Sequence, residues 1–230
     1  MQLTVRDVAQ LLSVTEKTIY RWIKGRSIPA YRIQEQYRFH RAEILEWATA
    51  RKIGVSAEIY QEDGEAGASA PGLADALAAG GIVYRLEGVD GESVLRAAVE
   101  AMRLPDELDR EQLLRVLVAR EALASTGVGD GIAIPHVRNP IVLHVPRPTV
   151  TLCFLERPVD FGALDGKPVH CLFTLVSPTI RAHLHLLSRL AFALRDPGFH
   201  AVVQRQALRD EILTELRRVE SALLAPRPGV

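Results

Sequence analysis

Residues 54–72 divide the sequence into two parts of opposite charge. This stretch has four acidic residues, no lysine or arginine, and many small residues, a composition typical of flexible linkers. Residues 1–52 hold ten Lys and Arg against five Asp and Glu, a net charge of +5. Residues 53–230 hold 18 against 23, a net charge of −5. We therefore predict a basic domain over 1–53, a linker over 54–72 and an acidic domain over 73–226.

The composition of the whole chain is that of an ordinary soluble globular protein. Of its 230 residues, 48% are hydrophobic and 24% are charged, close to the average for folded domains. No apolar run approaches the roughly 20 residues needed to span a bilayer, and the first residues lack the apolar core of a signal peptide. Cys153 and Cys171 lie in apolar, β-like runs without metal-ligand spacing, which favours core residues in a reducing compartment. We predict a cytoplasmic protein without membrane insertion.

The basic segment begins with the pattern of two short helices joined by a tight turn. Thr4 stands three residues before Asp7, as in a helix N-cap with an acidic partner in the first turn. Apolar residues then recur at helical spacing, at Val5, Val8, Leu11 and Leu12. Thr15 is placed to cap a second helix over 16–24, and Gly25 is placed to end it. This arrangement predicts a helix-turn-helix.

A hairpin and a third helix are predicted after this pair. Residues 28–39 have the pattern of a hairpin or wing, and residues 41–51 that of a helix with Ile44, Leu45 and Trp47 in its core face. We expect four aromatic side chains in the core, Tyr31, Tyr37, Phe39 and Trp47. The segment resembles the excisionase-like branch of the MerR-type DNA-binding fold. The matching motifs are LTVRDVA at 3–9, TEKTIYRWIKG at 15–25 and YRF at 37–39.

Several side chains of the basic segment are placed for contact with DNA. From the second helix, the candidates for phosphate or base contacts are Lys17, Thr18, Tyr20, Arg21 and Lys24. From the wing region, the candidates for backbone contacts are Arg32, Arg38 and Arg41. The alternative for each cation is a place on a solvated, charged face. Because a small single module contacts few base pairs, DNA binding is expected to need a dimer or neighbouring copies.

Residues 73–226 have the mixed pattern of a sheet covered by helices. Nearly continuous apolar runs predict strands at 82–86, 149–155 and 169–176. Helical apolar spacing predicts helices at 73–79, 91–102, 109–123, 182–194, 196–204 and 210–224. The predicted fold class is a small all-α winged helix-turn-helix domain followed by an α/β (α+β) domain with a mixed sheet flanked by helices.

In the acidic segment, alternating glycines lead to a histidine that follows a proline. Residues 125–138 are STGVGDGIAIPHVR. Glycine accepts backbone angles that other residues avoid, while Pro135 fixes its own φ and pushes Ile134 toward an extended conformation. His136 is therefore held in a restricted direction, and its imidazole, partly neutral near pH 7, is a candidate nucleophile. The alternative is a structural histidine in a turn.

This segment resembles enzyme IIA of the bacterial phosphotransferase system, of the fructose/mannitol and nitrogen-regulatory type. Four motifs in the same order carry the resemblance over about 73–225: RE at 120–121, the glycine stretch, PVDFGALDG at 158–166 and HLHLLSRLA at 183–191. The resemblance implies that His136 accepts a phosphoryl group from the phosphocarrier HPr or its nitrogen-branch counterpart. It also implies that Arg120 and His183 lie beside His136.

The residue types suit phosphoryl transfer, which depends on positioning and electrostatic stabilisation. Arg120 offers a rigid fork of donors to phosphoryl oxygens, and His183 offers a further donor. The hydroxyls of Ser125 or Thr126, with amides of the loop, would complete a small anion nest. The alternatives are a surface ion pair for Arg120 and a core or helix-surface position for His183.

The remaining sequence features narrow the chemistry. Positions 183 and 185 point to different sides of a helix, so only one of these histidines approaches His136, and the resemblance selects His183. We expect no functional role for His144, His170, His185 and His200. No spacing supports a metal site, and the glycine stretch lacks the Gly-Lys-Ser/Thr ending of a nucleotide loop. We therefore expect no metal and no cofactor, with the phosphate supplied by another protein. Val137 stands where many relatives have a small or polar residue; it could narrow access of a protein donor to His136, and the sequence leaves open whether it limits phosphorylation.

Together these features favour a transcription regulator in which a phosphohistidine domain controls a DNA-binding domain. Its expected partners are an HPr-like phosphocarrier and double-stranded DNA, with a second copy in a possible homodimer. The chain is then a phosphohistidine carrier and not an enzyme with a free substrate. One alternative is a phosphocarrier that hands phosphate to a sugar-permease IIB domain. Another is a regulatory protein that acts by binding other proteins.

Overall fold

The computed structural model divides into two compact units, Met1–Ala68 and Ser69–Val230. The residues it describes are 2–33, 35–51, 53, 71–137 and 145–224. Most of the predicted linker, residues 54–70, lies outside the described residues.

The first unit contains the helix pair and the hairpin predicted for it. Its elements are β1 (Gln2–Leu3), α1 (Val5–Leu11), α2 (Glu16–Lys24), β2 (Tyr31–Ile33), β3 (Gln36–His40) and α3 (Arg41–Ala50). The predicted caps are confirmed. The Asp7 amide donates to the Thr4 hydroxyl at 3.2 Å, the Thr4 amide donates to the Asp7 carboxylate at 2.8 Å, and Thr15 caps α2. These bonds satisfy amides that a helix start otherwise leaves unpaired.

The strands of the first unit form an antiparallel sheet of order β1-β3-β2. The strand β1 was not predicted, because two residues are too short to show a periodic pattern. Val8, Ile19, Phe39 and Ile44 are fully buried. Leu45 and Trp47 are buried as predicted.

The second unit is a five-stranded mixed sheet with helices on both faces. Its helices are α4 (Leu73–Gly80), α5 (Gly91–Ala101), α6 (Arg110–Leu123), α7 (Ile180–Ala193), α8 (Pro197–Gln204) and α9 (Arg209–Leu224). Its strands are β4 (Ile82–Leu86), β5 (Gly127–Gly129), β6 (Ile132–Ala133), β7 (Thr149–Val159) and β8 (Val169–Val176). The strand order is β4-β7-β8-β6-β5. Pairing is parallel for β4 with β7 and for β6 with β8, and antiparallel for the other two pairs.

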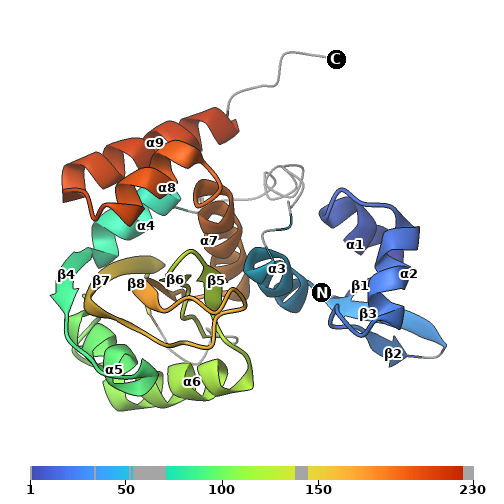
Figure 1. Ribbon diagram of the computed structural model, residues 1–230, viewed down its shortest axis with the longest axis horizontal. Helices are drawn as coiled ribbons and strands as arrows, with labels where there is room; N and C mark the ends of the chain where they lie inside the picture. Colours follow the sequence, from blue (N-terminus) through green and yellow to red (C-terminus); the bar gives the residue numbers. More distant parts are fainter. Residues whose placement is uncertain (1, 34, 52, 54–70, 138–144, 225–230) are drawn as a thin grey trace. The chain divides into compact units, whose positions relative to one another are not determined.

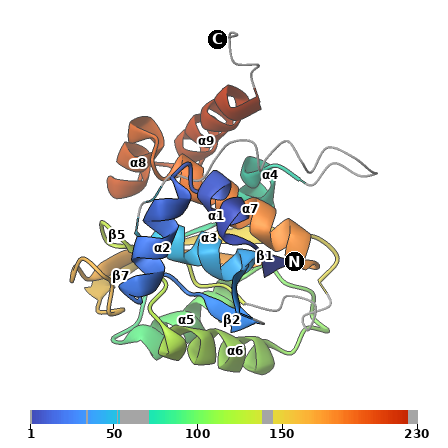
Figure 2. The same ribbon diagram turned by 90° about the vertical axis from the view of Figure 1, so that its right-hand side faces the viewer.

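The two faces of this sheet are covered by different helices. α5 and α6 lie on one face, and α4, α8 and α9 on the other (Figure 1, Figure 2). α7 contacts β8, α4 and α9 and so belongs to the second group. Cys153 and Cys171 are free thiols, fully buried on adjacent strands. Burial raises the pKa of the Cys153 thiol to about 12 and also raises that of Cys171, as expected for core residues.

Most predicted elements of the second unit are present. β4 and β8 have the predicted bounds, whereas β7 continues to Val159, beyond the predicted end at residue 155. The hairpin β5–β6 was not predicted, because its glycines hide the alternation by which strands are found. Of the described helices, none is long and apolar enough to cross a membrane.

Candidate functional sites

The glycine stretch forms the hairpin β5–β6, and its turn depends on glycine. Gly129, Asp130 and Gly131 all have positive φ, at 90°, 53° and 73°. A β-carbon on Gly131 would lie 2.4 Å from Cδ2 of His170, so this position also lacks room for a side chain. Both the left-handed backbone and the contact with the His170 ring therefore require glycine at 131.

His136 follows the hairpin and is fixed by its backbone neighbours. It forms a parallel bridge with Leu175 of β8, and its side chain is only 3% exposed. Its Nδ1 lies 2.7 Å from the Ile134 carbonyl oxygen. A carbonyl oxygen only accepts, so this hydrogen bond places the proton of the neutral ring on Nδ1 and the lone pair on Nε2.

His183 lies against His136, as the resemblance implied. It is in the first turns of α7, a helix capped by the Thr179 hydroxyl, which accepts from the Ala182 amide at 3.1 Å. The two ring centroids are 5.1 Å apart, with 34° between the ring planes, and His183 is 1% exposed. His185, two residues further along, is half-buried. The fold thus joins two histidines that are 47 positions apart in the sequence.

Arg120 lies near the end of α6, where the chain enters the glycine stretch. Its side chain is buried, at 7% exposed, and Nη1 donates to the Ala124 carbonyl at 2.8 Å. The next residue, Glu121, accepts from the Thr126 amide at 2.8 Å and from the Thr126 hydroxyl at 2.5 Å. This carboxylate clamps the start of the hairpin. Sequence reasoning assigned Glu121 no such role, although its place beside Arg120 in the RE motif was a signal.

The hydroxyls of Ser125 and Thr126 bond within the protein. Ser125 donates to the Phe161 carbonyl at 2.5 Å and accepts from the Gly127 amide at 3.0 Å. Thr126 is 4% exposed and donates to Glu121. In this structure both hydroxyls shape the loop before β5, and an incoming anion would have to compete with these bonds.

Val137 packs into the core of the second unit and does not cover His136. It is 3% exposed and belongs to the hydrophobic cluster with Val145 and Leu172. Neighbouring residues of an extended chain point to opposite faces, so Val137 fills the core while His136 meets His183. The structure thus removes the reason for expecting Val137 to obstruct the site.

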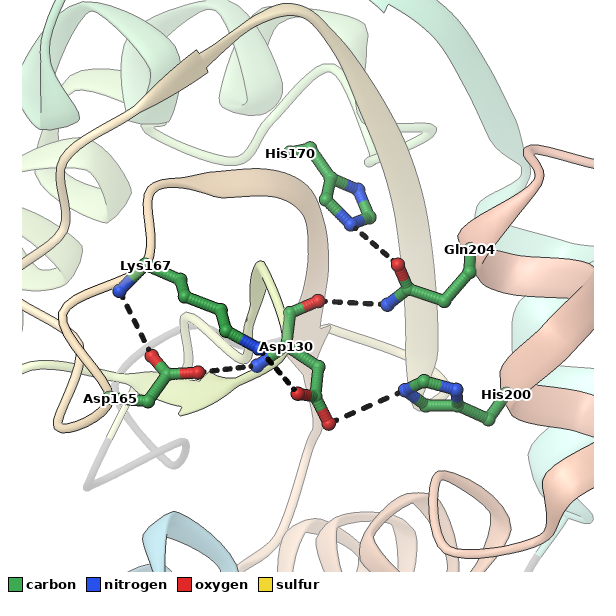
Figure 3. Close-up of polar contacts among 6 residues, drawn as sticks. All are labelled: Asp130, Asp165, Lys167, His170, His200 and Gln204. Carbon is green, nitrogen blue, oxygen red and sulfur yellow. Dashed lines mark hydrogen bonds and ion pairs between the residues drawn. The ribbon is translucent and has the colours of Figure 1, made fainter.

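The tip of the hairpin is tied to two other segments by polar contacts (Figure 3). The Asp130 carboxylate lies 3.2 Å from Lys167 Nζ and 3.6 Å from His200 Nε2, and its carbonyl accepts from Gln204 at 2.8 Å. Asp165 accepts from the Asp130 amide at 2.8 Å. Hydrogen bonds from the amides of Asp130 and Lys167 lower the pKa of Asp165.

The other histidines have structural places in this network or lie elsewhere. His170 Nε2 lies 3.1 Å from Gln204 Oε1, and His200 lies on α8. His144 lies outside the described residues. Within the described parts of the chain, no three His, Cys, Asp or Glu side chains are placed to hold a metal ion.

A candidate nucleic-acid surface lies on α2 of the first unit. Lys17, Tyr20, Arg21 and Lys24 are exposed and spaced by three or four residues, so they share one face of the helix. Tyr20 is 50% exposed and packs edge-on against Tyr37. The predicted contact Thr18 is half-buried, and its hydroxyl lies 3.1 Å from that of Thr15. Thr18 therefore belongs to the cap of α2.

The three wing-region arginines differ in their surroundings. Arg32 is exposed and paired with Glu35, while Arg38 is half-buried and donates to the Tyr37 carbonyl at 3.2 Å. Arg41 is half-buried at the start of α3.

Two wing tyrosines depart from the predicted core placement. Tyr31 is 43% exposed, and its hydroxyl donates to the Glu43 carboxylate at 2.9 Å. β2 is an edge strand with all three residues exposed, which accounts for the wrong prediction. Tyr37 is half-buried and Phe39 fully buried.

Comparisons with known proteins match both units to sequence families. Residues 77–219 match the family described as phosphoenolpyruvate-dependent sugar phosphotransferase system, EIIA 2. Residues 3–52 match the family described as helix-turn-helix domain.

Individual relatives match part of the chain. A nitrogen regulatory protein of Pseudomonas aeruginosa is 45% identical over 100 residues, which are 43% of this chain and 62% of that protein. A PTS system fructose-specific EIIA component of Haloferax volcanii is 39% identical over 105 residues, 45% of this chain and 64% of that protein. The chain thus spans less than two thirds of the length of these relatives. The crystal structure of nitrogen regulatory protein IIA-Ntr from Neisseria meningitidis has 29% identity and a TM-score of 0.55, and the match covers 63% of this chain and 98% of that one.

Proposed function

Since the chain belongs to the EIIA 2 family of the phosphoenolpyruvate-dependent sugar phosphotransferase system and carries an N-terminal helix-turn-helix domain, we propose that it is a transcription regulator that binds DNA and is phosphorylated on His136. The donor is an HPr-like phosphocarrier protein. The observation that carries the proposal is the hydrogen bond from His136 Nδ1 to the Ile134 carbonyl, because it leaves the lone pair on Nε2 of a ring that packs against the His183 ring.

The transfer exchanges one nitrogen–phosphorus bond for another. The lone pair of His136 Nε2 attacks the phosphorus of the donor's phosphohistidine, in line with the bond that breaks. The donor imidazole leaves with the electron pair of the broken bond. His136 keeps its Nδ1 proton on the Ile134 carbonyl, so the ring carries the phosphoryl group without a change of tautomer.

Arg120 and His183 supply the positive and donor groups that the phosphoryl oxygens need. His183 is already in ring contact with His136, and Arg120 is a buried guanidinium at the entry to the glycine stretch. Donors held in place before reaction stabilise charge that develops in the transition state. Charge-assisted hydrogen bonds from an arginine fork are among the strongest such contacts.

Exposed apolar side chains on the same elements suit docking of a protein donor. Leu123 at the end of α6 is 71% exposed, Leu164 in the loop before β8 is 63% exposed, and Ile180 at the start of α7 is 44% exposed. Leu123 lies on the helix that carries Arg120, and Ile180 lies on the helix that carries His183. Leu164 lies in the loop whose Ala163 contacts the glycine hairpin. Large exposed apolar residues with a polar surround are typical of protein contact surfaces.

The α2 face suits DNA for a different reason. Its three cations, Lys17, Arg21 and Lys24, lie in a row on a helix that presents them to solvent. Cations in such a row neutralise phosphates and release counterions, while Tyr20 adds a ring and a hydroxyl. The net charge of +5 over residues 1–52 agrees with a polyanionic partner.

Labelling by phosphoenolpyruvate, enzyme I and HPr tests the phosphorylation site. Wild-type protein is expected to incorporate label, and His136→Ala to incorporate none. His185→Gln, a change at a half-buried histidine of the same helix as His183, is expected to label like wild type. Equal labelling of wild type and His136→Ala would refute the assignment.

One relative's description supports a second candidate function. The Haloferax volcanii protein is described as a fructose-specific EIIA component, which favours a carrier that passes its phosphoryl group to a IIB domain. Transfer of label to a IIB protein, with no DNA binding by the full chain, would identify such a carrier. Salt-dependent DNA binding without transfer would identify the regulator.

A further inference from the structure

A pocket of about 160 Å³ lies in the second unit, between the end of α5 and the start of β7. Leu104, Pro105, Val145 and Pro146 form its apolar walls. Its polar lining consists of Arg103, Arg147 and Thr149. At about 30 Å³ per water molecule, the volume holds roughly five waters or one compact organic ion.

The two arginines of this pocket have no protein partner. Neither forms an ion pair or hydrogen bond with any residue that the structure describes. Three other arginines of the same unit pair with carboxylates: Arg85 with Glu156, Arg96 with Glu111 and Arg205 with Glu211. Arg103 and Arg147 line one pocket, and no carboxylate lies in its lining. Their charge is available to an anion from solution.

Packing and neighbouring bonds favour an anion at this place. The guanidinium of Arg103 lies over Gly81, where a β-carbon would be 3.3 Å from its Cζ, so the backbone limits its motion. Carbonyls at the end of α5 would repel an anion. Arg110 covers them, donating to the Met102 carbonyl at 3.3 Å and to the Val99 carbonyl at 2.5 Å.

Thr149 supplies a hydroxyl donor to the lining of the pocket. It is 7% exposed and held in register with Val176 of β8. Its hydroxyl makes no hydrogen bond to any described residue. The lining therefore combines two guanidinium groups and one hydroxyl with apolar walls, and includes no carboxylate.

We propose that this pocket is a binding site for a small organic dianion with carboxylate or phosphate groups and a short hydrocarbon body. The two arginines bind its charged oxygens through charge-assisted hydrogen bonds, and Thr149 donates a third. The apolar walls exclude large hydrated ions and contact the hydrocarbon part. Such a site would let the second unit respond to a metabolite.

Titration of the full chain with succinate and with inorganic phosphate tests the proposal. Calorimetry gives the affinity, and amide chemical shifts of Arg103, Leu104, Arg147 and Thr149 give the place. We expect saturable binding of succinate with shifts confined to these amides. Succinamide, the uncharged analogue, is expected to bind at least tenfold more weakly. Tighter binding of phosphate than of succinate would identify the phosphate class, and the reverse order the carboxylate class.

Variants distinguish binding of the anion in this pocket from non-specific attraction of the anion to surface arginines. Arg103→Gln and Arg147→Gln are each expected to weaken binding about tenfold, because each removes one guanidinium group that binds the oxygens of the anion. Arg157→Gln is the matched control, an exposed arginine eight residues further along β7 from Thr149, roughly 26 Å away. It is expected to bind like wild type. Equal weakening in all three variants, or no saturable binding of either anion, would overturn the proposal.

Discussion

At the residue scale, the turn before His136 is fixed by two separate constraints on one glycine. Gly131 has a φ of 73°, and the His170 ring occupies the space that a side chain would need. Gly166 has a similar φ of 67° but nothing within 4 Å of a built β-carbon. Comparing Gly131 with Gly166 therefore distinguishes the cost of a left-handed backbone from the cost of a steric clash.

We expect Gly131→Ala to destabilise the second unit more than Gly166→Ala. The second change meets only the cost of a left-handed alanine, about 1 kcal/mol. The first adds displacement of a packed ring, about 1–3 kcal/mol more. Urea unfolding followed by far-ultraviolet circular dichroism measures both. Equal losses of stability in the two variants would contradict the steric part of this explanation.

Single residues also show how far sequence reasoning reached. His136 was found because a Gly-rich stretch ending in Pro-His is a local pattern, and His183 because it lies in a second recognisable motif. The use of the Ser125 hydroxyl depends on Phe161, 36 residues away. The pairing of Arg103 and Arg147 around one pocket likewise arises only from the fold. Such contacts join segments whose separation carries no periodic signal.

At the element scale, the start of α4 is stabilised by a residue near the end of the chain. Glu220 of α9 accepts from the amides of Leu73 and Ala74 at 2.6 and 3.0 Å. It also pairs with Arg189 of α7 at 2.9 Å, with the two side chains only 11% and 13% exposed. One carboxylate thus joins three helices and satisfies amides that α4 leaves unpaired.

We expect Glu220→Gln to lower the free energy of unfolding by about 3 kcal/mol, because it leaves the buried Arg189 cation without its counter-charge. Glu211→Gln is the control, since its partnership with Arg205 is about half exposed and is worth less than about 1 kcal/mol. Chemical unfolding at constant pH compares the two. A similar loss of unfolding free energy in both variants would show that the buried Glu220–Arg189 pair contributes no more to stability than the exposed Glu211–Arg205 pair.

The α2 face makes a prediction about salt. If Arg21 meets a phosphate, Arg21→Ala should weaken DNA binding at every sequence and lower the slope of log K against log salt by about one. Arg85→Gln, a change at an exposed arginine of the second unit, should leave the slope unchanged. Fluorescence anisotropy over a salt series measures it. An unaltered slope for Arg21→Ala would remove Arg21 from the interface.

The helices and strands differ, for physical reasons, in how accurately their presence and bounds could be predicted from the sequence. Helices such as α1 and α2 have both a cap and an apolar repeat, so their bounds were visible. β8 is a continuous apolar run and was found with its bounds. β5 has three residues, two of them glycine, and β6 has only two residues, so pairing makes them strands and not local preference: β6 pairs with β8, and β5 pairs with β6. Tyr31 was wrongly predicted to be buried, because its exposure is set by the position of β2 at the edge of the sheet and not by its residue type.

At the scale of the whole molecule, a basic unit and an acidic unit share one chain. Residues 1–52 carry a net charge of +5 and residues 53–230 a net charge of −5. A phosphoryl group on His136 would add about −1.5 to −2 charges to the acidic part. For this change to regulate DNA binding, the two phosphorylation states must differ in their free energy of binding to DNA.

DNA affinity of the full chain with and without phosphate on His136 tests this account most directly. Wild type treated with phosphoenolpyruvate, enzyme I and HPr should differ from untreated wild type by at least about fivefold in Kd at fixed salt. His136→Ala should show one affinity under both treatments. Equal affinities of phosphorylated and unphosphorylated wild type would contradict the claim that His136 controls the DNA-binding unit.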